Sequence, residues 1–156
     1  MINKTQYFSD LKMGKINQGL AIEHLQTHFR KVLEDDKLVV EEFRNTNSVF
    51  DYRIRTHNIL IELKSRRNNI NKYPTQMIGH NKVSYGRTKM KTENQRVFFS
   101  FMLEEKNDKT KKELYLLEDN SDTIYKTKMC GNYARGDKTD KLCLINNNLL
   151  ELISIF

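Results

Sequence analysis

The stretch FDYRIRTHNILIELKSRR (residues 50–67) carries charged side chains inside two segments that otherwise resemble hydrophobic strands. Ile59, Ile61 and Leu63 form one apolar face of the second segment. The opposite face holds Glu62 and Lys64 together with the apolar residue Leu60. A fully exposed face would not need this leucine, so the face is expected to be covered at least in part. A chain that folds around this segment must therefore accommodate a carboxylate and an amine on a largely covered sheet.

The apolar pattern determines how the two segments pair, because residues that share a face on paired antiparallel strands must alternate together. A two-residue turn at 57–58 satisfies this condition. Its register pairs Ile54 with Ile61, Tyr52 with Leu63, Arg53 with Glu62, and Asp51 with Lys64. A three-residue turn would send Asp51 and Glu62 to opposite faces, and the hydrophobic pattern rejects it. We therefore expect Asp51, Glu62 and Lys64 on one surface.

Two neighbouring carboxylates repel each other, so a partly buried sheet that holds both raises a pKa or requires a cation. Mg²⁺ takes oxygen ligands of this kind, usually one or two carboxylates together with waters and substrate phosphates. An adjacent lysine such as Lys64 can orient a water molecule or stabilise a developing negative charge. The three residues are thus suited to metal-assisted hydrolysis of phosphodiesters.

Periodicity and turn residues predict the remaining elements along the chain. The apolar stripe of residues 14–34 predicts a helix, and Pro74 suits the first turn of a second helix that contains Gln76 and ends near residue 83 or 91. Strands are expected at 38–44, 49–55, 59–65, 95–105 and 113–119, with two more within 141–156. No element is assigned to residues 120–141. This order predicts a mixed α/β domain with helices on both faces of one sheet.

Length and composition suit one intracellular domain. The 156 residues can enclose a core, and only one Pro and six Gly occur, which disfavours long linkers. No run is long enough to span a membrane, and the N-terminus lacks a signal-peptide core. We expect a location in the cytoplasm, or in a nucleus or virus factory. Cys130 and Cys143 lack the spacing of a zinc site.

The net charge of +7 is concentrated in one window. Residues 51–96 hold 11 Lys and Arg against 3 acids, a balance of +8, and the rest of the chain balances at −1. A basic excess around covered carboxylates favours a polyanionic partner, and nucleic acid is the common one. The residues expected to contact it are Arg53, Arg66, Arg67, Lys72, Tyr73, Lys82, Arg87 and Lys89.

Asp51, followed after ten intervening residues by Glu62-Leu63-Lys64, resembles the PD-(D/E)XK nuclease superfamily, which includes restriction endonucleases and Holliday-junction resolvases. The resemblance covers roughly residues 14–104 and implies a restriction-endonuclease-like αβββαβ core with a mixed sheet flanked by helices. Residues 113–156 would form a β-rich C-terminal extension of the single nuclease-like domain 1–156. Phe50 stands where the motif has its Pro.

The resemblance also implies roles for individual residues. Asp51, Glu62 and the backbone carbonyl of Leu63 would ligate Mg²⁺ or Mn²⁺, and Lys64 would be the catalytic lysine. Many members add an acidic residue from the first helix, where Glu23 fits better than Glu34. Some place a Gln on the helix after the E-x-K strand, the position of Gln76. His80 stands where one exonuclease group has Tyr, which argues against that group.

The function expected from these features is metal-dependent hydrolysis of phosphodiester bonds in DNA, with endonuclease action favoured over exonuclease action. A non-catalytic nucleic-acid-binding protein with the same fold is the alternative. A third interpretation is a sheet face that carries only salt bridges, since cross-strand opposite charges stabilise sheets modestly. The basic window favours the nuclease. Pairing into a homodimer is left open, because many such nucleases pair in order to cut two strands.

Overall fold

The computed structural model describes residues 4–45, 47–105, 108, 110–131 and 140–156. Its two α-helices are α1 (Lys4–Val32) and α2 (His80–Glu93). The strands in this described part are β1 (Glu41–Glu42), β2 (Tyr52–Ile54), β3 (Ile59–Arg66), β4 (Thr75–Gly79), β5 (Arg96–Glu104), β6 (Lys112–Glu118), β7 (Lys126–Cys130), β8 (Asp140–Asn146) and β9 (Glu151–Ile155). Short 3₁₀ turns lie at Arg55–His57, Ile70–Lys72 and Asn147–Leu149.

A six-stranded sheet with the order β1-β2-β3-β5-β6-β9 forms the centre of the molecule. Strands β3 and β5 run parallel along their whole length, and the other neighbours are antiparallel. Every residue of β5 except Arg96 is buried, as its nearly continuous apolar run predicts for a central strand. The mixed α/β architecture and its restriction-endonuclease-like arrangement are therefore confirmed.

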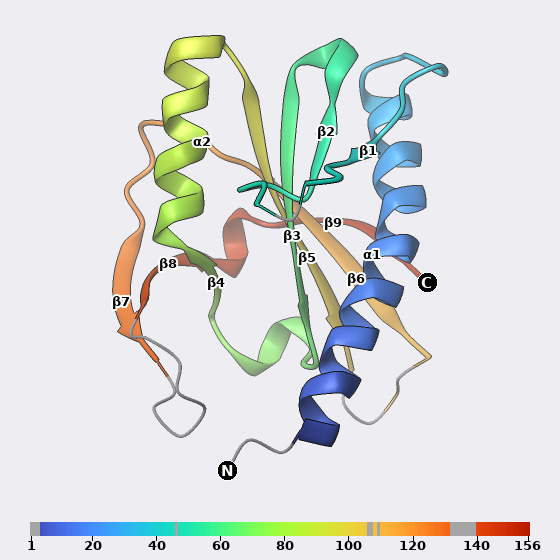
Figure 1. The fold of residues 1–156 in the computed structure, drawn as a ribbon, viewed down its shortest axis with the longest axis vertical. Coiled ribbons are helices and arrows are strands. Elements are labelled where there is room, and N and C mark those ends of the chain that lie inside the picture. Colours follow the sequence, from blue (N-terminus) through green and yellow to red (C-terminus); the bar gives the residue numbers. More distant parts are fainter. Residues whose placement is uncertain (1–3, 46, 106–107, 109, 132–139) are drawn as a thin grey trace.

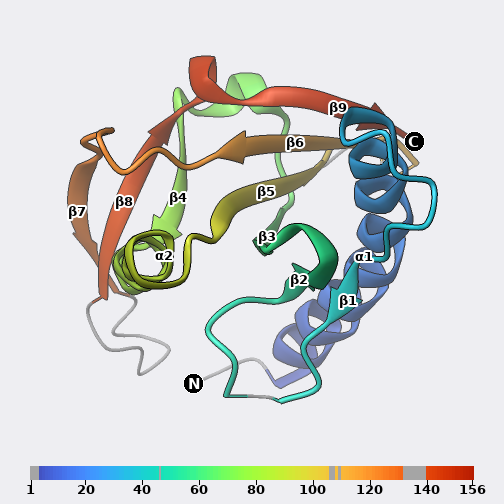
Figure 2. The same cartoon turned by 90° about the horizontal axis from the view of Figure 1, so that it is seen from above.

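The two helices cover opposite faces of this sheet (Figures 1 and 2). On one face, Ala21, Leu25 and Phe29 of α1 pack in the same core cluster as Ile61 and Leu63 of β3. These α1 residues recur every four positions, which places them on one stripe of the helix. The opposite face contributes Leu60, Phe99 and Phe101 to a second cluster that includes Val83 of α2. Alternation along β3 thus turns Glu62 and Lys64 toward α2.

A second sheet, with the order β4-β8-β7, lies beside α2 and was only partly expected (Figure 2). The sequence predicts a helix from Pro74 onward, and this prediction is wrong for residues 75–79, which form β4. Gln76 therefore sits on a strand, where it pairs with Ile145 of β8. The partner strand lies about seventy residues away in sequence, and such long-range pairing overrides local helix signals. Helix α2 begins only at His80.

The hairpin of β2 and β3 keeps the predicted faces but not the predicted register. The observed pairs are Tyr52 with Ile61, Arg53 with Leu60, and Ile54 with Ile59. The register is shifted by two residues because Arg55–His57 form a 3₁₀ turn that ends at Asn58 in the left-handed conformation. An even shift leaves every side chain on its own face. Continued by one residue, the observed register brings Asp51 level with Glu62 instead of Lys64.

Several elements near the two ends of the chain differ in length or position from those expected. Helix α1 begins ten residues before the predicted start at residue 14, and the strand expected at 38–44 is reduced to β1. Within residues 113–156, β6 and β9 belong to the central sheet, whereas β7 and β8 complete the second one. No helix in the described part of the chain is both long and apolar enough to cross a membrane.

Arg87 holds α2 to the segment after β6. Its guanidinium binds both carboxylate oxygens of Asp119, at 3.0 and 3.1 Å, and the carbonyl of Thr123 at 2.7 Å. The Asp119 side chain is fully buried, and the Arg87 side chain is about three-quarters buried. Arg87 also lies over the ring of Tyr125. These contacts indicate a structural role for Arg87, and its contact with nucleic acid stays a prediction.

Arg87→Leu should lower the free energy of unfolding by about 3 kcal/mol, because it leaves the buried Asp119 carboxylate without its partner. Lys89→Leu is the matched control on the same helix, since Lys89 pairs with the partly exposed Glu93. That change should cost much less, because exposed ion pairs contribute little to stability. Urea denaturation of both variants measures the difference, and equal losses would contradict the structural role of Arg87.

Candidate active site

Glu62 is the centre of the candidate site and is only 1% exposed. Its two carboxylate oxygens each meet a different lysine. Oε1 lies 2.8 Å from Nζ of Lys64, two residues further along β3, and Oε2 lies 3.2 Å from Nζ of Lys82 on α2. The side chains of both lysines keep contact with solvent, at 30% and 21% exposure. A buried carboxylate is thus held between two partly exposed ammonium groups.

The packing of α2 brings Lys82 to this position. Val83 and Gly86 are the buried residues of the helix. A Cβ atom at Gly86 would lie 3.0 Å from Val97 and 3.2 Å from Phe50, so the glycine permits a close approach to the sheet. Lys82 precedes Gly86 by one helical turn and therefore shares its inward direction. Its ammonium group also donates a hydrogen bond to the carbonyl oxygen of Val49.

Asp51 reaches the site from the bend that precedes β2. Its Oδ2 accepts a hydrogen bond from the backbone N–H of Leu63 at 2.8 Å, and its own carbonyl accepts one from Phe43 at 3.0 Å. In a strand, the N–H and the C=O of one residue point to the same side. The carbonyl of Leu63 therefore faces the edge of β3 where the Asp51 carboxylate lies.

Burial dominates the electrostatics of the site. It raises the pKa of Glu62 above its usual value of 4.5, and the nearby charge of Asp51 raises it further, whereas Lys64 and Lys82 act in the opposite direction. Two carboxylates and two ammonium groups together have no net charge. A cation that binds Glu62 would compete with Lys64 and Lys82 for its two carboxylate oxygens.

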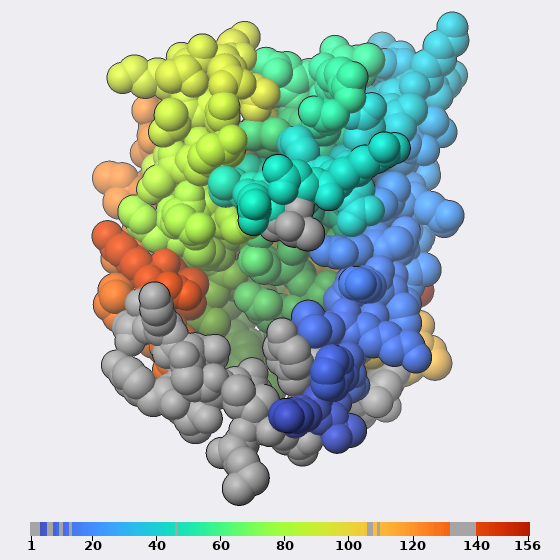
Figure 3. Space-filling view, viewed as in Figure 1, coloured from blue at the N-terminus to red at the C-terminus, as the bar shows by residue number. Residues whose placement is uncertain are grey.

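The oxygen atoms present suit a hard divalent cation. Within the described residues, no group of three or more His, Cys, Asp and Glu side chains is placed to hold a metal ion. Two carboxylates and a backbone carbonyl nevertheless form a ligand set that Mg²⁺ accepts, because this ion retains several waters and often binds substrate phosphates. Figure 3 shows the surface of β3 recessed between α1 and α2, which leaves access for such a substrate.

The other two residues predicted to be catalytic come from α1 and β4. Glu23 is exposed on α1, and α1 packs on the face of β3 that points away from Glu62. The catalytic role expected for Glu23 stays a prediction. Gln76 is buried on β4, where its side chain donates to Asn147 at 3.4 Å.

Most of the basic residues assigned to nucleic acid are already paired within the protein. Arg53 binds Glu41 at 3.0 Å, and Lys89 binds Glu93. Lys82 binds Glu62, and sequence reasoning missed this contact. The signal was weak, because it lies only in the spacing of Lys82 from Gly86 on a helix whose start was misplaced. A basic excess in sequence therefore overstates the charge that is available at the surface.

The remaining predicted contacts cluster after the end of β3. Arg66 is half-buried and donates to the carbonyls of Ser65 and Met77 at 3.2 and 3.4 Å. Arg67 is exposed directly after the strand, and Lys72 lies over the ring of the exposed Tyr73. Strand β3 thus connects the carboxylate site to a basic segment that follows it.

Comparison with known proteins gives one match. The family model described as "Phage putative PDDEXK endonuclease" matches residues 26–152, which is most of the chain. The matched range contains Asp51, Glu62 and Lys64 as well as the strands of both sheets up to the first two residues of β9. Searches of curated proteins and of solved structures give no match.

Glu62→Gln should stabilise the fold at high pH. Because burial raises the pKa of Glu62, the native state binds its proton more tightly than the unfolded state does, and ionised Glu62 costs stability. This cost is absent below the usual value of 4.5 and develops as the pH rises through the native pKa. We expect equal stabilities near pH 4 and a more stable Glu62→Gln protein at pH 8.

Urea denaturation at the two pH values measures this gain. Glu93→Gln is the control, since Glu93 is a partly exposed carboxylate whose loss should bring no gain that grows with pH. A Glu62→Gln protein that is less stable than wild type at pH 8 would show that the lysine pairs outweigh the cost of burial.

Proposed function

Because the chain belongs to the phage PDDEXK endonuclease family, we propose that it is a metal-dependent nuclease that cuts DNA. The reaction forms a bond between a water oxygen and phosphorus and breaks one phosphorus–oxygen ester bond. Asp51, Glu62 and the carbonyl of Leu63 would hold the metal ion, Mg²⁺ or Mn²⁺. Lys64 would be the catalytic lysine.

The observation that supports this proposal best is the buried Glu62 carboxylate with Lys64 at 2.8 Å and Asp51 at the adjacent strand edge. Ion pairs that serve stability alone are usually exposed and contribute little. Here the carboxylate is buried deeply enough to raise its pKa despite two lysines. Such a costly arrangement is typical of a functional site.

Charge balance favours a phosphodiester substrate. The four charged groups of the site sum to zero, so a bound divalent cation would leave an excess of two positive charges. One or two phosphodiester groups offset that excess. The cation would polarise a phosphate oxygen and make a bound water more acidic.

Lys64 has the position that its proposed task requires. Its ammonium group is partly exposed and directed to the Glu62 carboxylate, so it can donate hydrogen bonds to groups that approach this carboxylate. It would orient the attacking water or stabilise the charge that develops on the phosphate. Burial of Glu62 excludes bulk water from the other side of the pair and strengthens these interactions.

The basic segment after β3 would contact the DNA backbone, with Arg67, Lys72 and the exposed ring of Tyr73 as the leading contacts. Aromatic rings beside cations are suited to single-stranded or distorted nucleic acid, on which they stack. An intracellular location remains a prediction from the sequence, and so does a homodimer. A protein that binds DNA without cutting it is the alternative that experiment must exclude.

Glu62→Gln should abolish metal binding and cleavage together, because a neutral amide is a poor ligand for a hard cation. Lys64→Ala should keep metal and DNA binding while turnover falls by roughly 10²- to 10³-fold, since its work is in the transition state. Calorimetric titration with Mg²⁺ or Mn²⁺ and a cleavage assay on linear, circular, branched and single-stranded DNA measure these effects.

Lys72→Ala is the control for cleavage, because Lys72 lies outside the carboxylate site. It should lower DNA affinity with turnover at saturating DNA unchanged. Wild-type protein that binds DNA but cuts none of these forms with either metal would support the binding protein instead. Unchanged metal affinity in Glu62→Gln would remove Glu62 from the ligand set.

DNA affinity should fall steeply as the salt concentration rises. Fewer lysine and arginine side chains should contact phosphates than the basic window of the sequence contains. Lys72→Ala should lower the slope of log Kobs against log salt concentration by about 1, as expected for the loss of one phosphate contact. Lys89→Ala is the matched lysine control and should leave the slope unchanged, because Lys89 pairs with Glu93. Fluorescence anisotropy over a salt series without metal provides the slopes. Equal slopes for wild type and Lys72→Ala would exclude Lys72 as a phosphate contact.

A further inference from the structure

A pocket of about 370 Å³ lies between α1 and the end of β3, on the face of the sheet opposite Glu62. Leu63 and Ser65 of β3 line it from one side, and Gly14 and Asn17 of α1 from the other. Arg67 closes it at the end of the strand. The candidate active site does not use this pocket, although both are built on the same strand.

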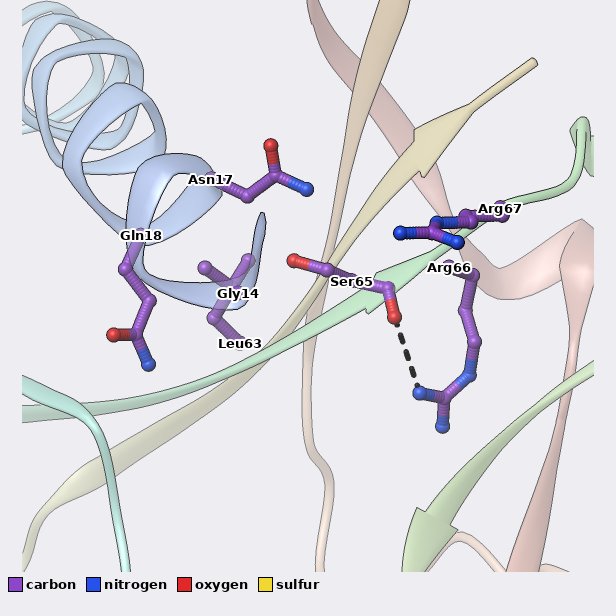
Figure 4. Close-up of a pocket in the computed structure, with 7 residues that line it drawn as sticks. All are labelled: Gly14, Asn17, Gln18, Leu63, Ser65, Arg66 and Arg67. Atoms are coloured by element: carbon purple, nitrogen blue, oxygen red, sulfur yellow. Dashed lines mark hydrogen bonds between the residues drawn. The ribbon is translucent and has the colours of Figure 1, made fainter. Parts of the chain in front are cut away.

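Three polar groups are directed into the same space (Figure 4). The carboxamide of Asn17 and the guanidinium of Arg67 point toward each other, with the hydroxyl of Ser65 between them. Arg66 turns away, because its guanidinium binds the carbonyls of Ser65 and Met77. All three groups in the pocket can donate hydrogen bonds, and one of them is a cation. Such a set suits an anionic ligand with several acceptor oxygens.

Asn17 gives an independent indication of a ligand. The residue is only 2% exposed, and its Oδ1 has no hydrogen-bond partner among the described residues. A buried polar atom without a partner costs stability, and most such atoms in proteins are paired. Because Oδ1 is an acceptor, its missing partner would be a donor such as water. The nitrogen of the same amide, which Figure 4 draws on the side of Arg67, can donate to an anion.

The pocket and the active site meet at the edge of β3 that β2 leaves uncovered, beyond the pair of Tyr52 with Ile61. Strand β2 pairs with β3 only as far as Ile61, whereas β5 follows the other edge of β3 to Arg66. Beyond Ile61, the described part of the chain places no strand on the β2 side of β3, and the Asp51 carboxylate binds Leu63 there. Lys64 and Ser65 point to opposite faces at this open edge, about 3.3 Å apart along the strand. One extended ligand that follows the edge can contact both.

We propose that this pocket binds a phosphate group of the DNA strand next to the phosphate that is cleaved. The proposal rests on the proposed nuclease function, because it takes its ligand from that substrate. Arg67, Ser65 and Asn17 would hold the phosphate and so fix the position of the strand relative to Lys64. The ligand is a phosphodiester within a strand and not a free phosphate ion.

Two glycines of α1 provide a matched test. A Cβ atom at either Gly14 or Gly19 would meet nothing within 4 Å, but only Gly14 lines the pocket. Gly14→Leu should weaken DNA binding about threefold to tenfold by filling the pocket, and Gly19→Leu should leave the affinity unchanged. Arg67→Gln should weaken binding tenfold or more, because hydrogen bonds from a charged group are the stronger ones.

Asn17→Leu separates a ligand contact from a structural role. It should weaken binding threefold to tenfold without lowering Tm, because the change removes a buried polar atom that has no partner. A fall in Tm with unchanged affinity would overturn the assignment of Asn17. All affinities are measured without metal by anisotropy of a labelled oligonucleotide about 20 nucleotides long, so that no cleavage occurs.

Single methylphosphonate substitutions along the oligonucleotide identify the bound phosphate. One position should weaken binding to wild type about tenfold and leave the affinity of Arg67→Gln unaffected. If every position acts equally on both proteins, or if inorganic phosphate binds wild type as tightly as the oligonucleotide does, the pocket does not hold a strand phosphate. Because these measurements need no cleavage, an inactive protein that passes them would overturn only the nuclease proposal. An active enzyme whose pocket variants bind DNA normally would overturn only the pocket.

Discussion

The buried carboxylate of Glu62 is the constraint on which the rest of this structure depends. A carboxylate that is 1% exposed in the middle of a sheet must be compensated by cationic groups that reach it. Lys64 comes from the same strand, and Lys82 comes from α2. The position of α2, and with it the close packing at Gly86, is therefore tied to the charge on β3. The helix that covers this face of the sheet also completes its site.

Pairing inside the protein decides which charges can act outside it. The window from 51 to 96 carries the whole basic excess of the sequence, yet Arg53, Lys82, Arg87 and Lys89 each bind a carboxylate of the same chain. Several of those carboxylates lie outside the window, so a local count misses them. Compensation of this kind means that the charge balance of a sequence window is a poor measure of the charge at the surface above it.

The sequence was most informative where a pattern of period two met a buried face. The parity of the β2–β3 hairpin follows from the apolar residues alone, and the observed pairs from Tyr52 to Ile54 keep it. The register was wrong because a 3₁₀ turn and the left-handed Asn58 are not visible in that pattern. Gln76 lies in a strand because β4 pairs with β8, and Lys82 reaches Glu62 because α2 begins at His80. The site was thus predictable where it lies on one hairpin and unpredictable where distant segments meet.

The late start of β2, at Tyr52, has a chemical consequence. If β2 had begun earlier, the N–H and C=O of Leu63 would bind a neighbouring strand and could serve no ligand. Instead the Asp51 side chain takes the Leu63 N–H at 2.8 Å, and the carbonyl stays directed to the same open edge. An interrupted strand thereby turns a backbone position inside a sheet into part of a site. It also leaves Lys64 on one face and Ser65 on the other within reach of one ligand, which a completed sheet would keep apart.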